Sequence, residues 1–261
     1  EIKRRFVPTT EIQKKLGRIL YVSDAAHSFG ATFQNKKIGF FADFTVFSFH
    51  AVKNLTTAEG GAICITLPPP FDNNLLYETL NILSLHGQNK DALAKTKKGG
   101  WEYDVEVAGF KCNMTDVLAS IGLVELERYE RETLPKRKWI TTYYSTEFKK
   151  YPWAIIPPLK TSERETSYHL FLLRIKDISL NQRNKIIEKV FEQGVSVNVH
   201  YKPLPELTIY KEMGYNLNEY PVSKLLWESE ISLPVYFDLT EVDMRKVVNA
   251  VVKAYNDTIL L

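Results

Sequence analysis

The sequence predicts an α/β fold, in which a mixed, mainly parallel sheet is followed by a smaller α+β domain. Short, continuously apolar runs alternate with helical stretches, and such unbroken runs are typical of strands covered on both faces. These runs are residues 18–22, 44–49 and 62–66. After Tyr151 and Pro152 the pattern changes to strand, helix, strand and a final helix. We therefore expect a large domain in residues 1–133 and a small domain in residues 134–261.

The elements of the expected large domain follow one another in a simple order. A helix over Thr10–Leu16 ends at Gly17 and leads into the first strand, which ends at Ser23 and Asp24. The next segments are the strands Phe44–Phe49 and Ala62–Thr66, a helix over 74–85, a long irregular stretch over 86–112, and a helical region from Met114 to about Lys150, interrupted at Pro135. A loop of that length inside a domain is usually functional.

The expected small domain has its own pattern of strands and helices. The segments are a strand over Tyr168–Ile175, a helix over Ile186–Gln193 that stops at Gly194, a strand over Val195–His200, and a helix over Glu241–Tyr255. Together they predict a compact α+β unit.

Composition excludes several classes of protein. The chain has 261 residues, 34 basic and 31 acidic side chains, and 44% hydrophobic residues, which excludes intrinsic disorder. A net charge of +3 gives no electrostatic case for nucleic acid. No apolar run approaches the roughly 20 residues of a membrane span, and no secretory leader is recognisable after Glu1. Two cysteines, Cys64 and Cys112, exclude a cysteine-based metal site and fit a reducing compartment, so we expect a cytoplasmic protein without a metal.

Polar side chains follow the first two predicted strands, where open α/β sheets bind ligands. Asp24 and His27 follow the first strand, and Ser48 and Lys53 follow the second. A partly buried lysine has a lowered pKa and can act as a nucleophile. Each residue also has a commoner structural explanation: a turn aspartate, a hydrogen-bonded histidine or a solvated lysine. Spacing alone therefore supports a cofactor site and nothing more specific.

Taken together, these segments resemble one known family. Residues 24–31 read DAAHSFGA and residues 47–61 read FSFHAVKNLTTAEGG, which is similar to the core signature of the DegT/DnrJ/EryC1/StrS aminotransferases. Further similar segments follow in the family's order: GFKCNMTD at 109–116, SYHLF at 167–171, HYKPL at 200–204 and ISLPVY at 231–236. The resemblance covers nearly the whole chain. It implies a fold-type I transferase dependent on pyridoxal 5'-phosphate (PLP).

The resemblance also implies roles for individual residues around the cofactor. Lys53 would hold PLP covalently and move a proton during transamination, and Asp24 would pair with the pyridine nitrogen. His27 would lie beside the ring and Ser48 would donate to the phosphate. Lys111 corresponds to a residue that reaches the phosphate from the neighbouring subunit, which implies a homodimer with a shared site. Asn113 is a further cofactor candidate, although many members carry arginine there.

The implied reaction transfers an amino group from glutamate to a keto sugar linked to a nucleotide, in the biosynthesis of polysaccharides or natural products. His86 and Tyr103 in the long loop are candidates for contacts with the sugar nucleotide. His200 and Tyr201 are candidates for the border of the substrate entrance, with packing as the other explanation.

The sequence also departs from the family pattern. Members carry a Gly-Thr or Gly-Ser turn that binds the phosphate, and an aromatic residue that stacks on PLP, both before the strand that ends in Asp24. Residues 1–20 contain neither, so we expect an incomplete large domain. One alternative is therefore a truncated, non-catalytic homologue that acts as a binding or regulatory protein. A second is PLP-dependent sugar deoxygenation, in which histidine replaces the lysine; the presence of Lys53 argues against it.

Overall fold

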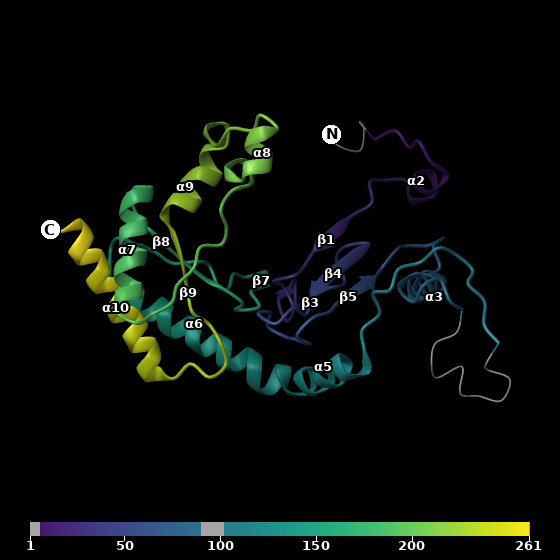
Figure 1. Cartoon of the computed structure of the whole chain (residues 1–261), viewed down its shortest axis with the longest axis horizontal. Coiled ribbons are helices and arrows are strands. Elements are labelled where there is room, and N and C mark those ends of the chain that lie inside the picture. Colours follow the sequence, from purple (N-terminus) through teal and green to yellow (C-terminus); the bar gives the residue numbers. More distant parts are fainter. Residues whose placement is uncertain (1–5, 90–101, 261) are drawn as a thin grey trace. The chain divides into compact units, whose positions relative to one another are not determined.

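The computed structural model describes residues 6–89 and 102–260 of the chain (Figure 1). The chain divides into two compact units, Glu1–Tyr129 and Glu130–Leu261. Both units combine helices with small sheets, which confirms the predicted mixed α/β class.

The first unit contains one three-stranded sheet that carries most of the predicted site residues. Its helices and strands are α2 (Glu11–Leu16), β1 (Val22–Asp24), β2 (Thr32–Phe33), β3 (Lys36–Lys37), β4 (Phe44–Ser48), β5 (Gly61–Ile65), α3 (Asn73–Ser84) and α5 (Asp116–Arg128). The sheet has the order β1-β4-β5, and β4 runs parallel to β1 and antiparallel to β5. The sheet is therefore mixed, with one pair of each kind.

Helix α2 has the boundaries that its sequence predicts. Thr10 and Gln13 form a capping box, and Gly17 ends the helix in a left-handed conformation (φ 68°). The strand that follows, however, begins at Val22 and not at residue 18. The cause is Asp43, whose carboxylate accepts the N–H of Tyr21 at 2.8 Å and binds the guanidinium of Arg18. These side-chain bonds replace strand pairing before Val22.

One face of the β1-β4-β5 sheet is covered and the other is exposed. On the covered side, Phe47 packs edge-on against Phe29 with ring centroids 5.5 Å apart. On the opposite side, Val22 and Ile63 are 54% and 50% exposed. The expectation that both faces of these strands are covered is therefore wrong within the described residues, because no described element packs over Val22 and Ile63.

The segment from Asp116 to Phe148 is helical, as predicted from Met114 onward, but its irregular turn lies before Pro135 and not at it. Helix α5 is followed by a π-helical turn, Tyr129–Thr133, and then by α6 (Leu134–Phe148). Pro135 does not interrupt the helix. It lies in the first turn of α6, where a missing N–H leaves no hydrogen bond unmade. Residues 90–101 of the predicted long loop lie outside the described part of the chain.

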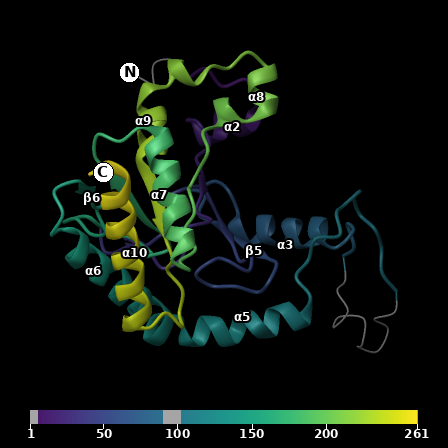
Figure 2. The same cartoon turned by 60° about the vertical axis from the view of Figure 1, so that its left-hand side comes forward.

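The second unit is an antiparallel sheet with helices packed on it. Its elements are α6 (Leu134–Phe148), β6 (Ala154–Ile155), β7 (Arg164–Glu165), β8 (Phe171–Ile175), α7 (Leu180–Glu192), α8 (Thr208–Glu212), α9 (Pro221–Ser229), β9 (Glu230–Leu233) and α10 (Glu241–Ile259). The sheet has the order β6-β8-β9. Helices α7 and α10 lie side by side (Figure 2).

The core of the second unit follows from the alternation of side chains along β8. Phe171, Leu173 and Ile175 point to one face of the sheet and are buried against α6, α7 and α10. Leu172 and Arg174 point to the opposite face and are only partly buried. The unit therefore has one apolar core and one face with mixed chemistry.

Two expectations for the second unit need correction. The predicted strand Val195–His200 does not form; its only ladder contact among the described residues is an isolated bridge from Asn198 to Ser232. The strand that pairs with β8 is β9, which sequence reasoning did not identify as a strand. Its four residues are all buried.

Among the described residues, none of the helices combines the length and apolar character that crossing a membrane would require.

Candidate active site

Strands β1 and β4 bring two predicted site residues to the same edge of the sheet. Asp24 is the last residue of β1 and Ser48 the last residue of β4. The strands are parallel and Asp24 pairs in register with Val46. Because side chains two residues apart on a strand share a face, Asp24 and Ser48 project from the same, exposed face of the sheet.

The side chain of Asp24 is held by its own turn. Its Oδ1 atom accepts a hydrogen bond from the N–H of Ala26 at 3.1 Å. The N–H of Ala25, the residue after Asp24, donates to the carbonyl of Val46 at 2.8 Å. This fixes the carboxylate at the strand end while leaving it solvent-accessible. His27 follows in the same turn and is partly buried.

Lys53 lies in the loop that connects β4 to β5. Its backbone N–H donates to the carbonyl of His50 at 2.9 Å, and the N–H of His50 donates to the Ser48 hydroxyl at 3.3 Å. The loop is closed by a bond from the N–H of Phe49 to the carbonyl of Gly60 at 2.8 Å. The Lys53 side chain is partly buried and makes no hydrogen bond or ion pair with any described residue. Its amine is therefore available for chemistry.

Tyr129 and Asn54, which the sequence did not indicate as site residues, hold these two loops together by hydrogen bonds. The Tyr129 hydroxyl donates to the carbonyl of Phe29 at 2.7 Å, in the loop after β1, and receives the Asn54 amide at 3.3 Å, from the loop after β4. Gly30 allows this approach, because a Cβ there would lie 2.5 Å from the tyrosine oxygen. Asn54 is buried, and its place directly after Lys53 in the motif is the one sequence signal for this role.

A second group of predicted residues meets elsewhere in the first unit. The N–H of His86 donates to the carbonyl of Phe110 at 2.9 Å, which sets His86 beside Lys111. The Lys111 ammonium in turn donates to the side-chain oxygen of Asn113. All three side chains are exposed. No hydrogen bond or ion pair between described residues joins this group to Asp24 or Lys53. Tyr103, which is also exposed, lies between His86 and Lys111 in the sequence.

The remaining predicted residues, His200 and Tyr201, belong to the second unit. They line a cavity of about 400 Å³ over β8 and β9, next to the buried carboxylate of Glu230. The predicted residues thus fall into three groups: Asp24, His27, Ser48 and Lys53; His86, Tyr103, Lys111 and Asn113; and His200 with Tyr201.

Known proteins share both the sequence and the fold of this chain. A putative sugar aminotransferase of Streptococcus pneumoniae, solved in its PMP form, superposes with a TM-score of 0.90 at 42% identity over 98% of this chain and 64% of its own. An uncharacterised protein of Methanocaldococcus jannaschii is 38% identical over 243 residues, which is 91% of this chain and 61% of that protein.

A third relative has a named reaction. UDP-4-amino-4,6-dideoxy-N-acetyl-beta-L-altrosamine transaminase of Campylobacter jejuni is 30% identical over 87% of this chain and 56% of its own length. The chain thus spans less than two thirds of the length of each of these relatives.

The family model confirms the resemblance that the motifs around Asp24 and Lys53 indicated. It matches residues 10–252, which is most of both units. The chain belongs to the DegT/DnrJ/EryC1/StrS aminotransferase family.

Proposed function

We propose that this chain contributes the lysine and the aspartate of a PLP-dependent aminotransferase that moves an amino group from glutamate to a nucleotide-linked keto sugar. The observation that carries the proposal is the placement of Asp24 at the end of β1 and of Lys53 in the loop that follows β4, the strand parallel to β1. PLP is the cofactor of the family, and the pneumococcal protein is known in PLP and PMP forms. The Campylobacter enzyme supports a UDP-linked sugar as the substrate class.

The chemistry of the side chains fits the cofactor. The Asp24 carboxylate and the Ser48 hydroxyl lie at the ends of β1 and β4. The Lys53 amine, which has no partner among the described residues, lies in the loop after β4. These three groups match a pyridine nitrogen, a phosphate and an aldehyde. Bound there, PLP would supply an electron sink for the carbon that loses a proton.

Each residue then has a defined task. The Asp24 carboxylate would keep the ring nitrogen protonated by pairing with it, and the Ser48 hydroxyl would donate to a phosphate oxygen. The Lys53 Nζ atom would bind the aldehyde carbon, and after release it would take the proton from the α-carbon of the amino donor and return it to the accepting carbon. His27, in the turn after β1, would border the ring.

Further residues would complete the site in a homodimer. We propose that Lys111 and Asn113, which contact each other on an exposed surface, reach the phosphate of the partner's cofactor. His86, beside Lys111, and Tyr103 would contact the sugar nucleotide. His200 and Tyr201 would border the substrate entrance. Both cysteines are unpaired thiols, which supports the cytoplasm as the location.

Absorbance spectroscopy tests the proposal directly. The full chain, mixed with PLP, should develop the visible band of a lysine-bound cofactor, and glutamate should bleach it. Lys53→Ala should abolish the band and lower the rate of 2-oxoglutarate formation by about 10³-fold or more. Asp24→Asn should keep the band and lower the rate by roughly 10²-fold, as expected for loss of one preorganised charged partner.

A matched control separates the specific lysine from general charge loss. Lys36 is an exposed lysine of β3 in the same unit, and Lys36→Ala should leave band and rate unchanged. A wild-type chain that binds no PLP would contradict the proposal and favour the non-catalytic homologue. For that alternative, the exposed face of the β1-β4-β5 sheet is the supporting observation.

A further inference from the structure

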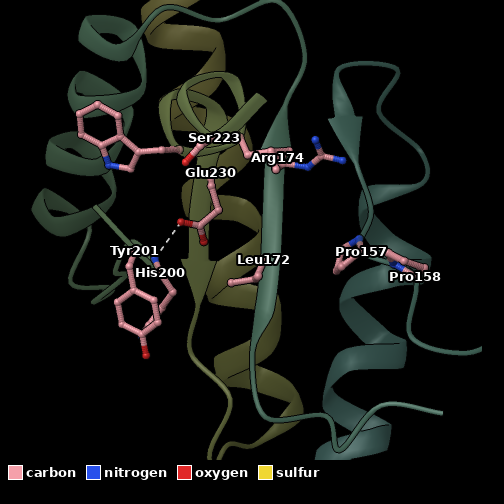
Figure 3. A pocket seen from close by; sticks show the side chains of 10 residues that line it. Pro157, Pro158, Leu172, Arg174, His200, Tyr201, Ser223 and Glu230 are labelled. Atoms are coloured by element: carbon pink, nitrogen blue, oxygen red, sulfur yellow. Dashed lines mark hydrogen bonds between the residues drawn. The ribbon is translucent and has the colours of Figure 1, made fainter. Parts of the chain in front are cut away.

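A cavity in the second unit includes an arginine, Arg174, to which the proposed transamination gives no role, beside His200 and Tyr201 of the proposed substrate entrance. It has a volume of about 400 Å³, which is within the usual range for small-molecule sites. It lies on the face of the β6-β8-β9 sheet opposite the apolar core, and α9 forms part of its wall (Figure 3). We call it the Arg174 cavity; the residues that matter below are Arg174, His200, Tyr201, Trp227 and Glu230.

Arg174 is a partly buried cation that has no counterion in the part of the chain that the structure describes. It pairs in register with Glu230 across β8 and β9, so the two side chains leave the same face of the sheet. Nevertheless the guanidinium makes no hydrogen bond or ion pair with any described residue. Figure 3 shows it turned away from Glu230, toward Pro157. An unpaired, partly desolvated guanidinium is costly unless an anion binds it.

Glu230 does not serve as that anion because its carboxylate is already bound. The Ser232 hydroxyl donates to one of its oxygens, and the N–H of His200 donates to the other at 3.0 Å. The His200 Nδ1 atom lies 2.7 Å from the Ser232 hydroxyl oxygen. Since that hydroxyl gives its hydrogen to Glu230, Nδ1 is the donor in this contact. The network holds Glu230 and His200 in the floor of the cavity.

The lining of the cavity holds one arginine, Arg174, and one carboxylate, Glu230. Arg183, buried on α7 and outside the lining, interacts electrostatically with both Glu230 and Glu228, and its Nε atom has no hydrogen-bond partner among the described residues. Burial raises the pKa of Glu230, while the Ser232 hydroxyl, the His200 N–H and Arg183 lower it. Glu230 therefore interacts with Arg183 and with its own hydrogen-bond donors, whereas Arg174 has no charged partner among the described residues and can bind an anionic ligand.

The walls favour a flat ligand. The aromatic side chains of Tyr201 and Trp227 line the cavity together with Pro157, Pro158 and Leu172. Aromatic and proline surfaces suit the face of a planar ring, and the guanidinium of Arg174 suits a bidentate phosphate or carboxylate. Apolar walls with a few fixed polar groups are typical of ligand sites.

We propose that the Arg174 cavity binds a small aromatic anion, a flat ring that carries a phosphate or a carboxylate, with the anionic group on Arg174 and the ring against Tyr201 and Trp227. The site consists of residues of the second unit alone. Ligand binding there does not require PLP, so it is tested without the cofactor, and its failure would leave the proposed transamination standing.

Isothermal titration of the full chain tests the proposal. The probes are uridine monophosphate and benzoate as aromatic anions, uridine as the neutral ring, and inorganic phosphate as the bare anion. We expect at least one aromatic anion to bind at least tenfold more tightly than both uridine and inorganic phosphate. Arg174→Gln should weaken that binding by about tenfold or more, because a charged hydrogen bond is lost. Arg174→Lys should fall between, since lysine keeps the charge but loses the bidentate geometry.

Arg245→Gln is the matched control. Arg245 is an exposed arginine of α10, which packs on the opposite face of the sheet, so its loss should leave binding unchanged. Circular dichroism melts of each variant exclude unfolding as the cause of weaker binding. Phosphate or uridine binding as tightly as the aromatic anions would overturn the proposal. Absence of binding, or equal affinity of wild type and Arg174→Gln, would overturn it as well.

Discussion

The two units of this chain differ in how their helices and sheets are buried. In the second unit, α6, α7 and α10 each bury side chains in one apolar cluster with β8 and β9. In the first unit, α2, α3 and α5 bury none, and one face of the β1-β4-β5 sheet is exposed. Burial of apolar surface is the main stabilising term in folding. We therefore expect the stability of the second unit to come from its own core, whereas the proposed PLP residues stand on a sheet with much less burial.

Truncation of matched phenylalanines should give the largest contrast between the units. Phe148 of the second unit is fully buried, and Phe110 of the first unit is 72% exposed. Phe148→Ala should lower the free energy of unfolding by about 3–5 kcal/mol, through lost burial and a residual cavity. Phe110→Ala should change it by less than about 0.5 kcal/mol. Urea unfolding followed by circular dichroism measures both, and similar losses would contradict the contrast.

A buried arginine gives the second unit a polar anchor as well as an apolar core. Arg137 donates from Nη1 to the carbonyls of Tyr168, His169 and Val235 at 3.4, 3.3 and 3.0 Å. Arg137→Met would leave buried carbonyl oxygens without a donor, so we expect a loss of about 2–3 kcal/mol in the free energy of unfolding. Lys149→Met, at an exposed position just after α6, is the control and should cost little. An unchanged free energy of unfolding in Arg137→Met would contradict this prediction and show that water replaces the guanidinium as the donor.

Sequence patterns predicted the elements that depend on local signals. The capping residues Thr10 and Gly17 define α2, and the period-3.6 pattern of residues 241–255 falls within α10. Strand positions were less predictable because they depend on distant partners. The first strand begins at Val22 and not at residue 18 because the Asp43 carboxylate accepts the hydrogen bond from the N–H of Tyr21. Residues 195–200 resemble a strand, but among the described residues their backbone pairs with β9 only at the isolated bridge between Asn198 and Ser232.

The candidate site was predictable only where a motif marks it. Asp24, Ser48 and Lys53 belong to recognisable segments, and the parallel pairing of β1 with β4 explains why two of them share an edge. The support from Tyr129 could not be predicted, because its hydroxyl meets the Phe29 carbonyl 100 residues away in sequence. The orientation of Arg174 likewise depends on its register with β9 and has no sequence signal.

Acid titration should reveal a smaller contribution within the second unit. Glu165 accepts hydrogen bonds from Lys138, Lys160 and Tyr168, which lower its pKa from 4.5 to about 2. Because the folded-state pKa lies below the unfolded one, the stabilisation is complete above about pH 5 and is lost as the pH falls toward 2. Since the two lysines are solvent-exposed, we expect Glu165→Gln to cost only about 1 kcal/mol at neutral pH.

The pH dependence provides the check on Glu165. The difference in unfolding free energy between wild type and Glu165→Gln should shrink toward zero near pH 2, in urea titrations repeated at several pH values. Asp177→Asn, at an exposed carboxylate whose nearest lysine nitrogen is 4.0 Å away, should show little effect at any of these pH values. A Glu165→Gln difference that does not vary with pH would mean that the carboxylate acts through its shape and not its charge.

The smallest effect is expected on the exposed sheet face of the first unit, and it decides whether that face is open in solution. Ile63→Ser removes an apolar side chain that is half exposed, so the free energy of unfolding should fall by no more than about 0.5–1 kcal/mol. The same change at the buried Leu173 of β8 should cost several-fold more. Sedimentation should also show the same association state for wild type and Ile63→Ser. If Ile63→Ser instead costs about 2 kcal/mol or more, with a loss that grows with protein concentration, a second copy covers this face. The contrast between the two units would then reflect an interface, because burial across an interface stabilises a fold by the same physics as burial within a core.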